Sequence, residues 1–443
     1  MKTIILIFVI LLMSLCVFAH KYEDAYKRTE KLSAVQEFYT DYVPHTDKNG
    51  NPMTEYVPGK SFFQIALWGA PSGEVLGETY DWKKFEEMGF NTIWPWKEHA
   101  TEHSLLLGKE HNMQIVLQKL ITEEEAEKIK DNPNLLACTW YDEPTNYWDN
   151  RDTNLAAYKE YVDMVRKHGV KVCVNNNSWI TEPATEYFGE FDSYGDMACH
   201  DNYPIKNGEG RAKTLSDARV LGSFFRGIDG TVAFSRELNE QKKPVWYIVA
   251  AFAQPTEYGK QYSYRFPTAD QVRSQVYTAI IHGATGIIYF AWDSYLLREG
   301  GCIGMSDNPK ADVSQGKYMK ATPAELMDSR LNYEAVKQTN KELGELAPYI
   351  LSPTVKDVTY NVQVEGVAVS ENPIRCLLKP DGNGGYILFT VNMDDSFLKG
   401  TFSFDKDIKE AKIMFEDDKT AEIKDNTFSF SYEPFESHII HIN

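Results

Sequence analysis

The sequence predicts an α/β chain built as a (β/α)₈ TIM barrel followed by a small all-β sandwich. From residue 60 to about residue 346, short apolar runs alternate with amphipathic helical segments. Eight such runs occur, which is the number that closes a parallel barrel. After Pro348 the rhythm changes to alternating apolar and polar residues, which is typical of antiparallel strands.

The runs assigned to barrel strands are almost wholly apolar, as expected for parallel strands buried on both faces. An open doubly wound sheet is the rival arrangement, but no Gly-rich phosphate-binding turn follows the first run. The expected strands are 62–68, 91–96, 113–118, 135–141, 170–174, 193–199, 244–252 and 286–292. The expected helices are 82–88, 100–111, 122–130, 155–168, one within 212–238, 268–282 and 331–346.

The C-terminal part carries seven alternating segments separated by turn signals such as residues 380–384. They are 355–362, 374–378, 385–392, 400–404, 411–415, 427–432 and 438–442. The predicted organisation is therefore a signal peptide at 1–19, a lead-in segment at 20–58, a catalytic barrel at 59–348 and a β-sandwich at 349–443.

Residues 1–19 have the pattern of a secretory signal peptide. Lys2 precedes an apolar stretch over 4–18, and Ala19 is a small residue at the expected cleavage position. A membrane anchor is the alternative, but the stretch is short for a span and no second one follows. We expect a mature chain without a membrane span, either secreted or placed in an endomembrane or lysosomal lumen.

Composition excludes some partners. The net charge of −18 repels phosphate backbones, so nucleic acid is not an expected partner. Aromatic residues make up 13% of the chain, which suits stacking against sugar faces as well as a large aromatic core.

No cofactor or metal is expected. Removal of Cys16 with the signal leaves an odd number of widely spaced cysteines, which forms neither a disulfide framework nor a zinc motif. Cys138, Cys173 and Cys199 fall in apolar runs and are expected to be buried. His99 and His103 are four apart on an expected helix, and we expect surface or hydrogen-bonded histidines there and not a zinc site.

Functional residues of a (β/α)₈ barrel lie at the C-terminal ends of its strands. Acids, amides and indoles gather at those positions in this chain, and such groups bind sugar hydroxyls and stack on sugar rings. The candidate site residues are Trp68, Trp96, Gln118, Asp142, Glu143, Asn175, Asp201, Tyr203, Gln254, Trp292 and Asp293.

The most specific motif is Thr-Trp-Tyr-Asp-Glu-Pro at 139–144. It resembles the retaining glycoside hydrolases of clan A, including β-galactosidase-type enzymes, whose fourth strand ends in Asn-Glu. The resemblance implies that Glu143 is the general acid/base and that Asp142 takes the place of the Asn that binds the 2-hydroxyl. The change to Asp places two acids side by side, which would help to keep Glu143 protonated. A helix N-terminal cap is the alternative interpretation of this motif.

The second carboxyl group is less clear from the sequence. The clan places a Glu after strand seven, where this chain has Gln254, which cannot act as a nucleophile. Asp201 is the preferred candidate, although it could instead accept backbone hydrogen bonds in its loop. The other candidates are Glu98, Glu257 and Asp293.

Two further expectations come from the strand ends. The segment 282–292 resembles the clan's last strand, where Trp292 would stack under a sugar ring. Asn176 heads the one glycan-acceptor sequence, but it falls inside the expected cleft, so we expect it to be unused.

The sequence thus predicts a secreted glycoside hydrolase that cleaves O-glycosidic bonds of a carbohydrate substrate with two carboxyl groups. A non-catalytic carbohydrate-binding barrel and an inert structural barrel are the alternatives, because a fold alone does not fix a function.

Overall fold

A computed structural model describes the chain from residue 46 to residue 443. It excludes residues 56, 58, 71–73, 76–77, 80–81, 97–100, 147–150, 178–183, 206–212, 217, 221–222, 226, 240–242, 255–263, 294, 298–299, 307–322 and 417–418. The expected signal peptide and most of the lead-in segment lie outside the described residues.

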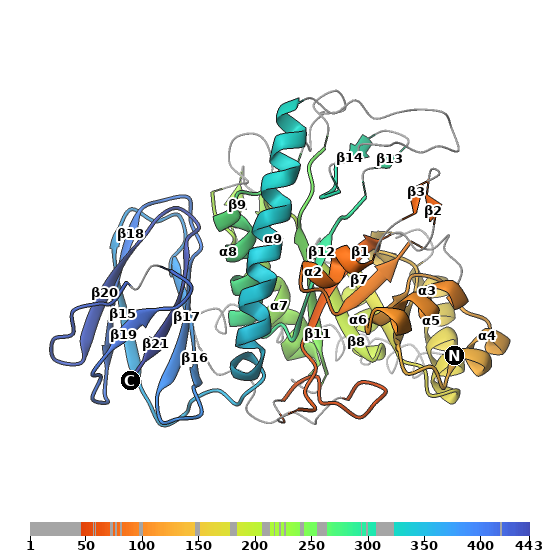
Figure 1. Ribbon diagram of the computed structural model, residues 1–443, viewed down its shortest axis with the longest axis horizontal. Coiled ribbons are helices and arrows are strands. Elements are labelled where there is room, and N and C mark those ends of the chain that lie inside the picture. The colour runs from red at the N-terminus through yellow and green to blue at the C-terminus, as the bar shows by residue number, and fades with distance from the viewer. Residues whose placement is uncertain are drawn as a thin grey trace, which may run out of the picture.

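Eight parallel strands form a closed barrel, which confirms the predicted fold class (Figure 1). Their order around the barrel is β1, β12, β11, β8, β7, β6, β5 and β4, and β1 pairs with both β12 and β4. The strands are β1 (Gln64–Ala70), β4 (Thr92–Pro95), β5 (Gln114–Leu117), β6 (Leu135–Thr139), β7 (Val172–Asn177), β8 (Met197–Asp201), β11 (Val245–Ala250) and β12 (Gly286–Phe290).

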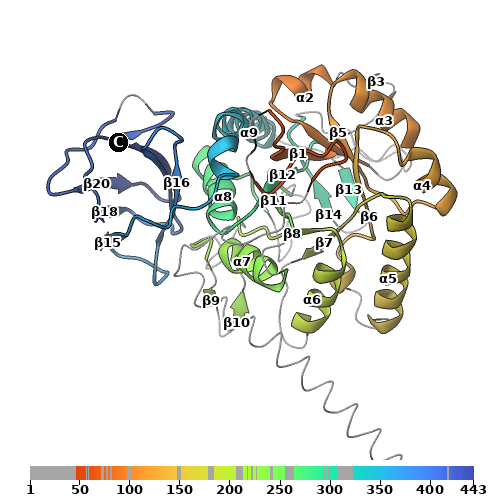
Figure 2. The ribbon, with the colours of Figure 1, turned by 90° about the horizontal axis from the view of Figure 1, so that it is seen from below.

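Helices surround the barrel strands, as the view in Figure 2 shows. They are α2 (Lys83–Glu87), α3 (Thr101–Glu110), α4 (Glu123–Ile129), α5 (Arg151–Lys167), α6 (Ala184–Tyr194), α7 (Ile228–Leu238), α8 (Ala269–Ile281) and α9 (Pro323–Ile350), with the 3₁₀ turn η1 (Pro144–Asn146) after β6. The sequence analysis proposed no separate helix at α6. Helix α9 begins before the expected residue 331 and reaches the sandwich.

The starts of two helices follow directly from their sequences. Thr122 and Thr268 each accept a hydrogen bond from the backbone three residues on, at Glu125 and Gln271, and those side chains bond back to the caps. Such capping boxes satisfy two backbone donors that a helix start leaves without partners, and so they fix where α4 and α8 begin.

Alternation along the strands separates two apolar layers. The barrel interior includes Trp68, Trp94, Cys173, Cys199 and Trp246. The intervening residues face the helices and belong to the larger core between barrel wall and helices. All the cysteines from Cys138 onward are buried and unpaired, as expected for the three that the sequence analysis assigned to packing.

The C-terminal part is two antiparallel sheets packed face to face, with the orders β15-β18-β20 and β16-β17-β21-β19. The strands are β15 (Tyr360–Gly366), β16 (Ile374–Pro380), β17 (Tyr386–Asn392), β18 (Leu398–Phe404), β19 (Ala411–Ile413), β20 (Thr427–Tyr432) and β21 (Ser437–Ile442). All seven predicted segments are therefore strands.

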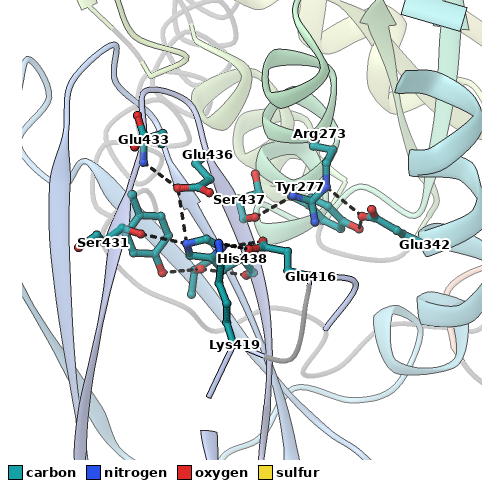
Figure 3. Close-up of polar contacts among 12 residues, drawn as sticks. Arg273, Tyr277, Glu342, Glu416, Lys419, Ser431, Glu433, Glu436, Ser437 and His438 are labelled. Carbon is teal, nitrogen blue, oxygen red and sulfur yellow. Dashed lines mark hydrogen bonds and ion pairs between the residues drawn. The ribbon is translucent and has the colours of Figure 1, made fainter. Parts of the chain in front are cut away.

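A buried ion pair and a hydrogen bond join the sandwich to helices α7 and α8. Arg375 of β16 lies 3.2 Å from Asp229 of α7. Arg273 of α8 donates both to Glu342 of α9 (3.0 Å) and to the carbonyl oxygen of Ser437 in β21 (2.9 Å), as Figure 3 shows. These contacts join the sandwich to the outer helices of the barrel, away from the strand ends.

Three short hairpins complete the described chain: β2 (Glu74–Val75) with β3 (Glu78–Thr79), β9 (Ala218–Val220) with β10 (Ser223–Phe225), and β13 (Tyr295–Leu297) with β14 (Gly300–Cys302). Among the described residues, no helix has the length and apolar character that a membrane crossing requires.

Candidate active site

The end of β6 places two carboxyl groups at the mouth of the barrel. Trp140 turns outward and packs on Tyr158 and Tyr161 of α5, with ring centroids 5.7 and 5.1 Å away. Asp142 and Glu143 then follow, and only the short turn η1 begins at Pro144, because helix α5 starts at Arg151. The motif therefore ends a barrel strand, and it does not cap the next α-helix.

Glu143 is fixed by its backbone. Its φ of +45° lies in the left-handed region, which is uncommon for a residue other than glycine. Its N–H donates to the carbonyl oxygen of Asn175 at 3.0 Å, so the end of β6 is tied to β7. Non-glycine residues held in this region cluster at functional sites, where the surrounding structure maintains them.

Strand β7 presents alternate asparagines to the barrel interior. Asn175 is 4% exposed, and its Nδ2 donates to Oδ1 of Asp142 at 2.9 Å. Asn177 points to the same side and pairs in register with Asp201 of β8. Asn176 points the other way and is fully buried, so it does not reach the surface as a glycan acceptor would.

Asp201 ends β8 inside the barrel, where it is 7% exposed. Its carboxyl group lies near those of Glu143 and Asp142 and near the amide of Asn175. Burial raises the pKa of Asp201 well above its ordinary value, and the charges of Glu143 and Asp142 raise it further. From the sequence we expected this effect of a neighbouring acid at Glu143; in the structure it acts on Asp201.

The neighbouring histidine takes no part in this group. His200 points to the outer side of β8, and its Nε2 lies 3.0 Å from Oδ1 of Asp192 on α6. Both side chains are fully buried, and the ring also stacks on Phe188 of the same helix. His200 therefore anchors α6 to the barrel wall.

Indole rings lie at the ends of β1 and β4. Trp68 stacks on Trp94 with centroids 4.8 Å apart, and the indole nitrogen of Trp96 donates to Oδ2 of Asp293 at 3.3 Å. Gly69 has a φ of +74°, and a Cβ there would lie 2.6 Å from the Trp96 ring. Only glycine lets this ring approach the backbone so closely.

A second group of rings follows Asp201. Tyr203 contacts Phe252 (5.1 Å between centroids), Phe290 (5.9 Å) and Tyr264 (5.8 Å). Phe252 and Phe290 are interior positions at the ends of β11 and β12. The sequence analysis missed both, although counting every second residue along each strand would have identified them.

Three of the candidate site residues, Gln118, Gln254 and Trp292, contact other parts of the barrel. Gln118 donates to the carbonyl oxygen of Trp94 at 3.0 Å and so links β5 to β4. Gln254 bonds to the backbone of Tyr264 through both its amide oxygen and its own N–H. Trp292 is 2% exposed and packs on Phe85 of α2 at 4.9 Å, within the core between barrel and helices. The expectation that Trp292 stacks beneath a sugar ring is not met by this packing.

The structure thus brings Asp142, Glu143, Asn175 and Asp201 together at the ends of three adjacent strands. Trp68, Trp96, Tyr203 and Asp293 lie at strand ends of the same barrel face. Glu98 and Glu257, the other candidates for the second carboxyl, lie outside the described residues, as does His99.

Within the described residues, one group has side chains close enough to hold a metal ion: Glu416, Glu436 and His438 of the sandwich (Figure 3). Its ligand atoms already have partners. The imidazole of His438 lies 2.9 Å from Glu416 through Nδ1 and 3.1 Å from the Ser431 carbonyl oxygen through Nε2. Burial would raise the pKa of Glu416, but His438 and Lys419 lower it to about 2. This group is therefore satisfied as an internal charge cluster.

Comparison with known proteins assigns no family to the chain. No family model matches the chain, and no curated protein matches it.

Among solved structures, an AmyP variant in complex with maltotriose is 10% identical, with a TM-score of 0.45, covering 85% of this chain and 93% of that one. An α-amylase from H. orenii is 9% identical (TM-score 0.44; 86% and 99% covered), and a β-glucuronidase from Faecalibacterium prausnitzii is 11% identical (0.41; 66% and 51%). A 3-deoxy-D-arabino-heptulosonate 7-phosphate synthase from Thermotoga maritima also matches (13%; 0.35; 66% and 92%). All these TM-scores are below 0.5, and they carry no argument about the activity of this chain.

Proposed function

We propose that this chain is a glycoside hydrolase that cleaves O-glycosidic bonds at the mouth of its barrel, with Glu143 and Asp201 as the carboxyl pair. One observation carries the proposal: Asp201, buried at the end of β8, lies near Glu143 at the end of β6. Two carboxyl groups with different surroundings, facing one another at the functional face of a barrel, are what glycoside hydrolysis requires.

The surroundings of the pair supply groups that bind sugars. Asn175 and Asp142 offer an amide and a carboxylate beside the pair, and amides and acids bind hydroxyl groups. Trp68, Trp96 and Tyr203 offer rings that stack on the apolar faces of sugars. In this proposal, Asp293 completes the binding surface, and a carbohydrate is the partner of the protein. Gln118 and Gln254, which were also expected to bind the substrate, hold neighbouring backbone in place at the strand ends.

The two carboxyl groups interact directly, whereas hydrolysis with retention needs a separation of about 5–5.5 Å and inversion about 6.5–9.5 Å. A substrate therefore has to part them. Glu143 is half-buried and Asp201 is buried. In this proposal the side chain of Glu143 therefore rotates to make room for the substrate. Catalytic contacts in free enzymes commonly differ from those with substrate bound.

The short separation of the two carboxyl groups also favours a second candidate function, a carbohydrate-binding barrel without catalysis. The end of β11 points the same way. Strand β11 ends in Ala250 and continues with Ala-Phe-Ala-Gln, so it contributes no acid near the pair. In that case the pair would be a recognition element only, and binding would persist when one carboxyl group is replaced by an amide.

The experiment is a screen of the purified full chain against aryl glycosides and polysaccharides, with Glu143→Gln and Asp201→Asn beside it. Exposed positions give matched controls, Glu160→Gln on α5 and Asp407→Asn in the sandwich. Hydrolysis by the wild type and the controls, with a loss of about 10²–10⁴-fold in either site variant, supports the proposal. Glycan binding without turnover, unchanged in Glu143→Gln, would instead establish the binding function.

The proposal includes secretion through residues 1–19. Expression of the full chain in a secreting host should give an extracellular protein whose first residue is His20. Retention of residues 1–19 on a membrane-bound product would contradict it.

A further inference from the structure

We infer that a pocket at the N-terminal end of the barrel binds a small tetrahedral oxyanion such as phosphate or sulfate. Three lysines from separate segments line this pocket together with apolar and backbone groups. The lining residues are Lys48, Lys130, Leu135, Leu136, Gly169, Val170 and Lys171. The inference does not depend on glycoside hydrolysis, because it concerns a different end of the molecule.

The pocket lies where two barrel strands begin. Leu135 and Leu136 are the first residues of β6, and Lys171 directly precedes β7. Lys130 ends α4, and Lys48 belongs to the described part of the lead-in segment. Parallel strands begin at one end of a barrel and finish at the other, so the pocket lies at the end opposite the candidate active site.

Hydrogen bonds fix the loop that carries Lys48. The carboxylate of Asp47 accepts from the backbone N–H of Asn51 at 2.8 Å and from the Nδ2 of the same residue at 2.9 Å. Nζ of Lys171 donates to the carbonyl oxygen of Thr46. The loop is thus closed on itself and attached to the barrel, and Lys48 is held against the pocket.

The ammonium group of Lys48 is the main observation. Its Nζ is buried, and it has no hydrogen-bond partner in the part of the chain that the structure describes. A buried charge without a partner is costly, and buried polar groups that lack a protein partner commonly bind an ion or water. Water supplies only an acceptor, whereas an anion supplies an acceptor and the compensating charge.

The other two lysines have partners but keep further donors. Nζ of Lys130 lies 2.7 Å from Glu127, and Lys171 bonds to the backbone of Thr46. Because an ammonium group has three N–H donors, each of these lysines can also donate to a ligand in the pocket.

Nearby carboxylates offset part of this positive charge but leave Lys48 without a bond. Asp47 and Asp196 act on Lys171, and both already accept hydrogen bonds, Asp196 from a backbone N–H of β7 and an arginine of α5. Asp131 is exposed, and its charge raises the pKa of Lys48 against the larger lowering by burial. Among the described residues, therefore, no acid bonds to the Lys48 ammonium group.

The size of the pocket limits the ligand. Its volume is about 250 Å³, including the space open to solvent, which is below the ~300–1,000 Å³ of sites for drug-sized molecules. A small ion fits this volume. A tetrahedral oxyanion offers a separate oxygen to each of three ammonium groups, whereas a carboxylate has only two, and lysine binds phosphate as a point charge.

The first test measures the melting temperature of the full chain in millimolar phosphate, with chloride adjusted to constant ionic strength. The wild type should gain about 2–5 °C at saturation. Lys48→Met keeps the side-chain length without the charge and should show no gain. The matched control is Lys409→Met, an exposed lysine of the sandwich, which should respond as the wild type does.

The same two proteins should change order without the ligand. In chloride alone, Lys48→Met should melt at the wild-type temperature or above it, because it no longer buries an unpaired charge. A variant that melts far below the wild type in chloride, or that fails to fold, would overturn the inference, since Lys48 would then have a stabilising partner within the protein.

The second test is titration calorimetry with inorganic phosphate. It should give one site in the wild type, and an affinity weaker by about tenfold or more in Lys48→Met. Sulfate should compete with phosphate, and acetate should not. Equal responses in the wild type and Lys48→Met, a response to acetate alone, or a wild type without any response would each refute the site.

Discussion

Asp201 and Asp229 are both buried aspartates of the barrel, and their surroundings shift their pKa values in opposite directions. Burial raises the pKa of each. For Asp229 the Arg375 guanidinium and the hydrogen bonds from Ser216 and Gly230 outweigh burial and lower it. For Asp201 the nearest charges are carboxylates, so the pKa rises further.

The comparison separates a structural carboxyl group from a functional one. Asp229 has an arginine from the sandwich, and together they join two parts of the molecule. Asp201 has two acids beside it at the open end of the barrel, an arrangement that adds nothing to stability. Titratable groups with strongly perturbed pKa values tend to mark functional sites, and Asp201 has the surroundings of such a group.

The largest effect, on the free energy of unfolding, is expected for the buried ion pair of Arg375 and Asp229. Arg375→Met would leave Asp229 buried without its cation, which should lower the free energy of unfolding by about 3–5 kcal/mol. Chemical denaturation measures this. The double variant with Asp229→Asn should recover part of the loss, and equal losses in the single and double variants would contradict a direct pair.

The next effect concerns Trp292, which the sequence assigned to the sugar site and the structure places in the core. Trp292→Leu should lower the free energy of unfolding by about 2–4 kcal/mol, because it leaves a cavity beside Phe85. The kcat on any glycoside that the wild type cleaves should be unchanged. Unchanged stability with weakened substrate binding would place Trp292 in the site after all.

A smaller effect is expected on the pH dependence of the free energy of unfolding, which differs between Asp201 and Asp229. Since the folded pKa of Asp201 is raised, the folded chain holds more protons than the unfolded chain above about pH 4. Its free energy of unfolding therefore falls as the pH rises, by about 1.4 kcal/mol per pH unit until the folded pKa is passed.

Asp201→Asn should remove that slope, so its stability relative to the wild type should increase between pH 5 and pH 8. Asp229, with a lowered pKa, stabilises the fold above its unfolded pKa near 4, and this contribution is lost as the pH falls. Denaturation curves across the pH range measure both. Parallel pH curves for Asp201→Asn and the wild type would show that the carboxyl is ionised in the fold.

The smallest effect, on substrate binding, is expected for Trp96 after the end of β4. Trp96→Phe removes the hydrogen bond to Asp293 but keeps a ring, and should raise KM several-fold, by about 1 kcal/mol in binding. Glu160→Gln on α5, which lies outside the site, serves as the control. A fall in kcat with KM unchanged would show that Trp96 acts on the reaction and not on binding.

Much of the fold could be predicted because its signals are local. The apolar runs, the alternating segments and the turn signals predicted all eight barrel strands and all seven sandwich strands. Helix α6 was missed, although Phe188 and Phe191 are spaced three apart on its buried side. The site was predicted in part, because strand ends are readable from sequence while the directions of side chains such as Trp292 are not.

The sequence by itself determined which residues reach the C-terminal ends of the strands, because strand length and alternation depend on neighbouring residues only. Only the tertiary structure decided that Asp201 meets Glu143, that Asn175 bonds to Asp142, and that Arg375 of the sandwich reaches Asp229. Each of these contacts joins residues from different elements. Their electrostatic consequences depend on burial and on distances between charges, neither of which exists before the chain has folded.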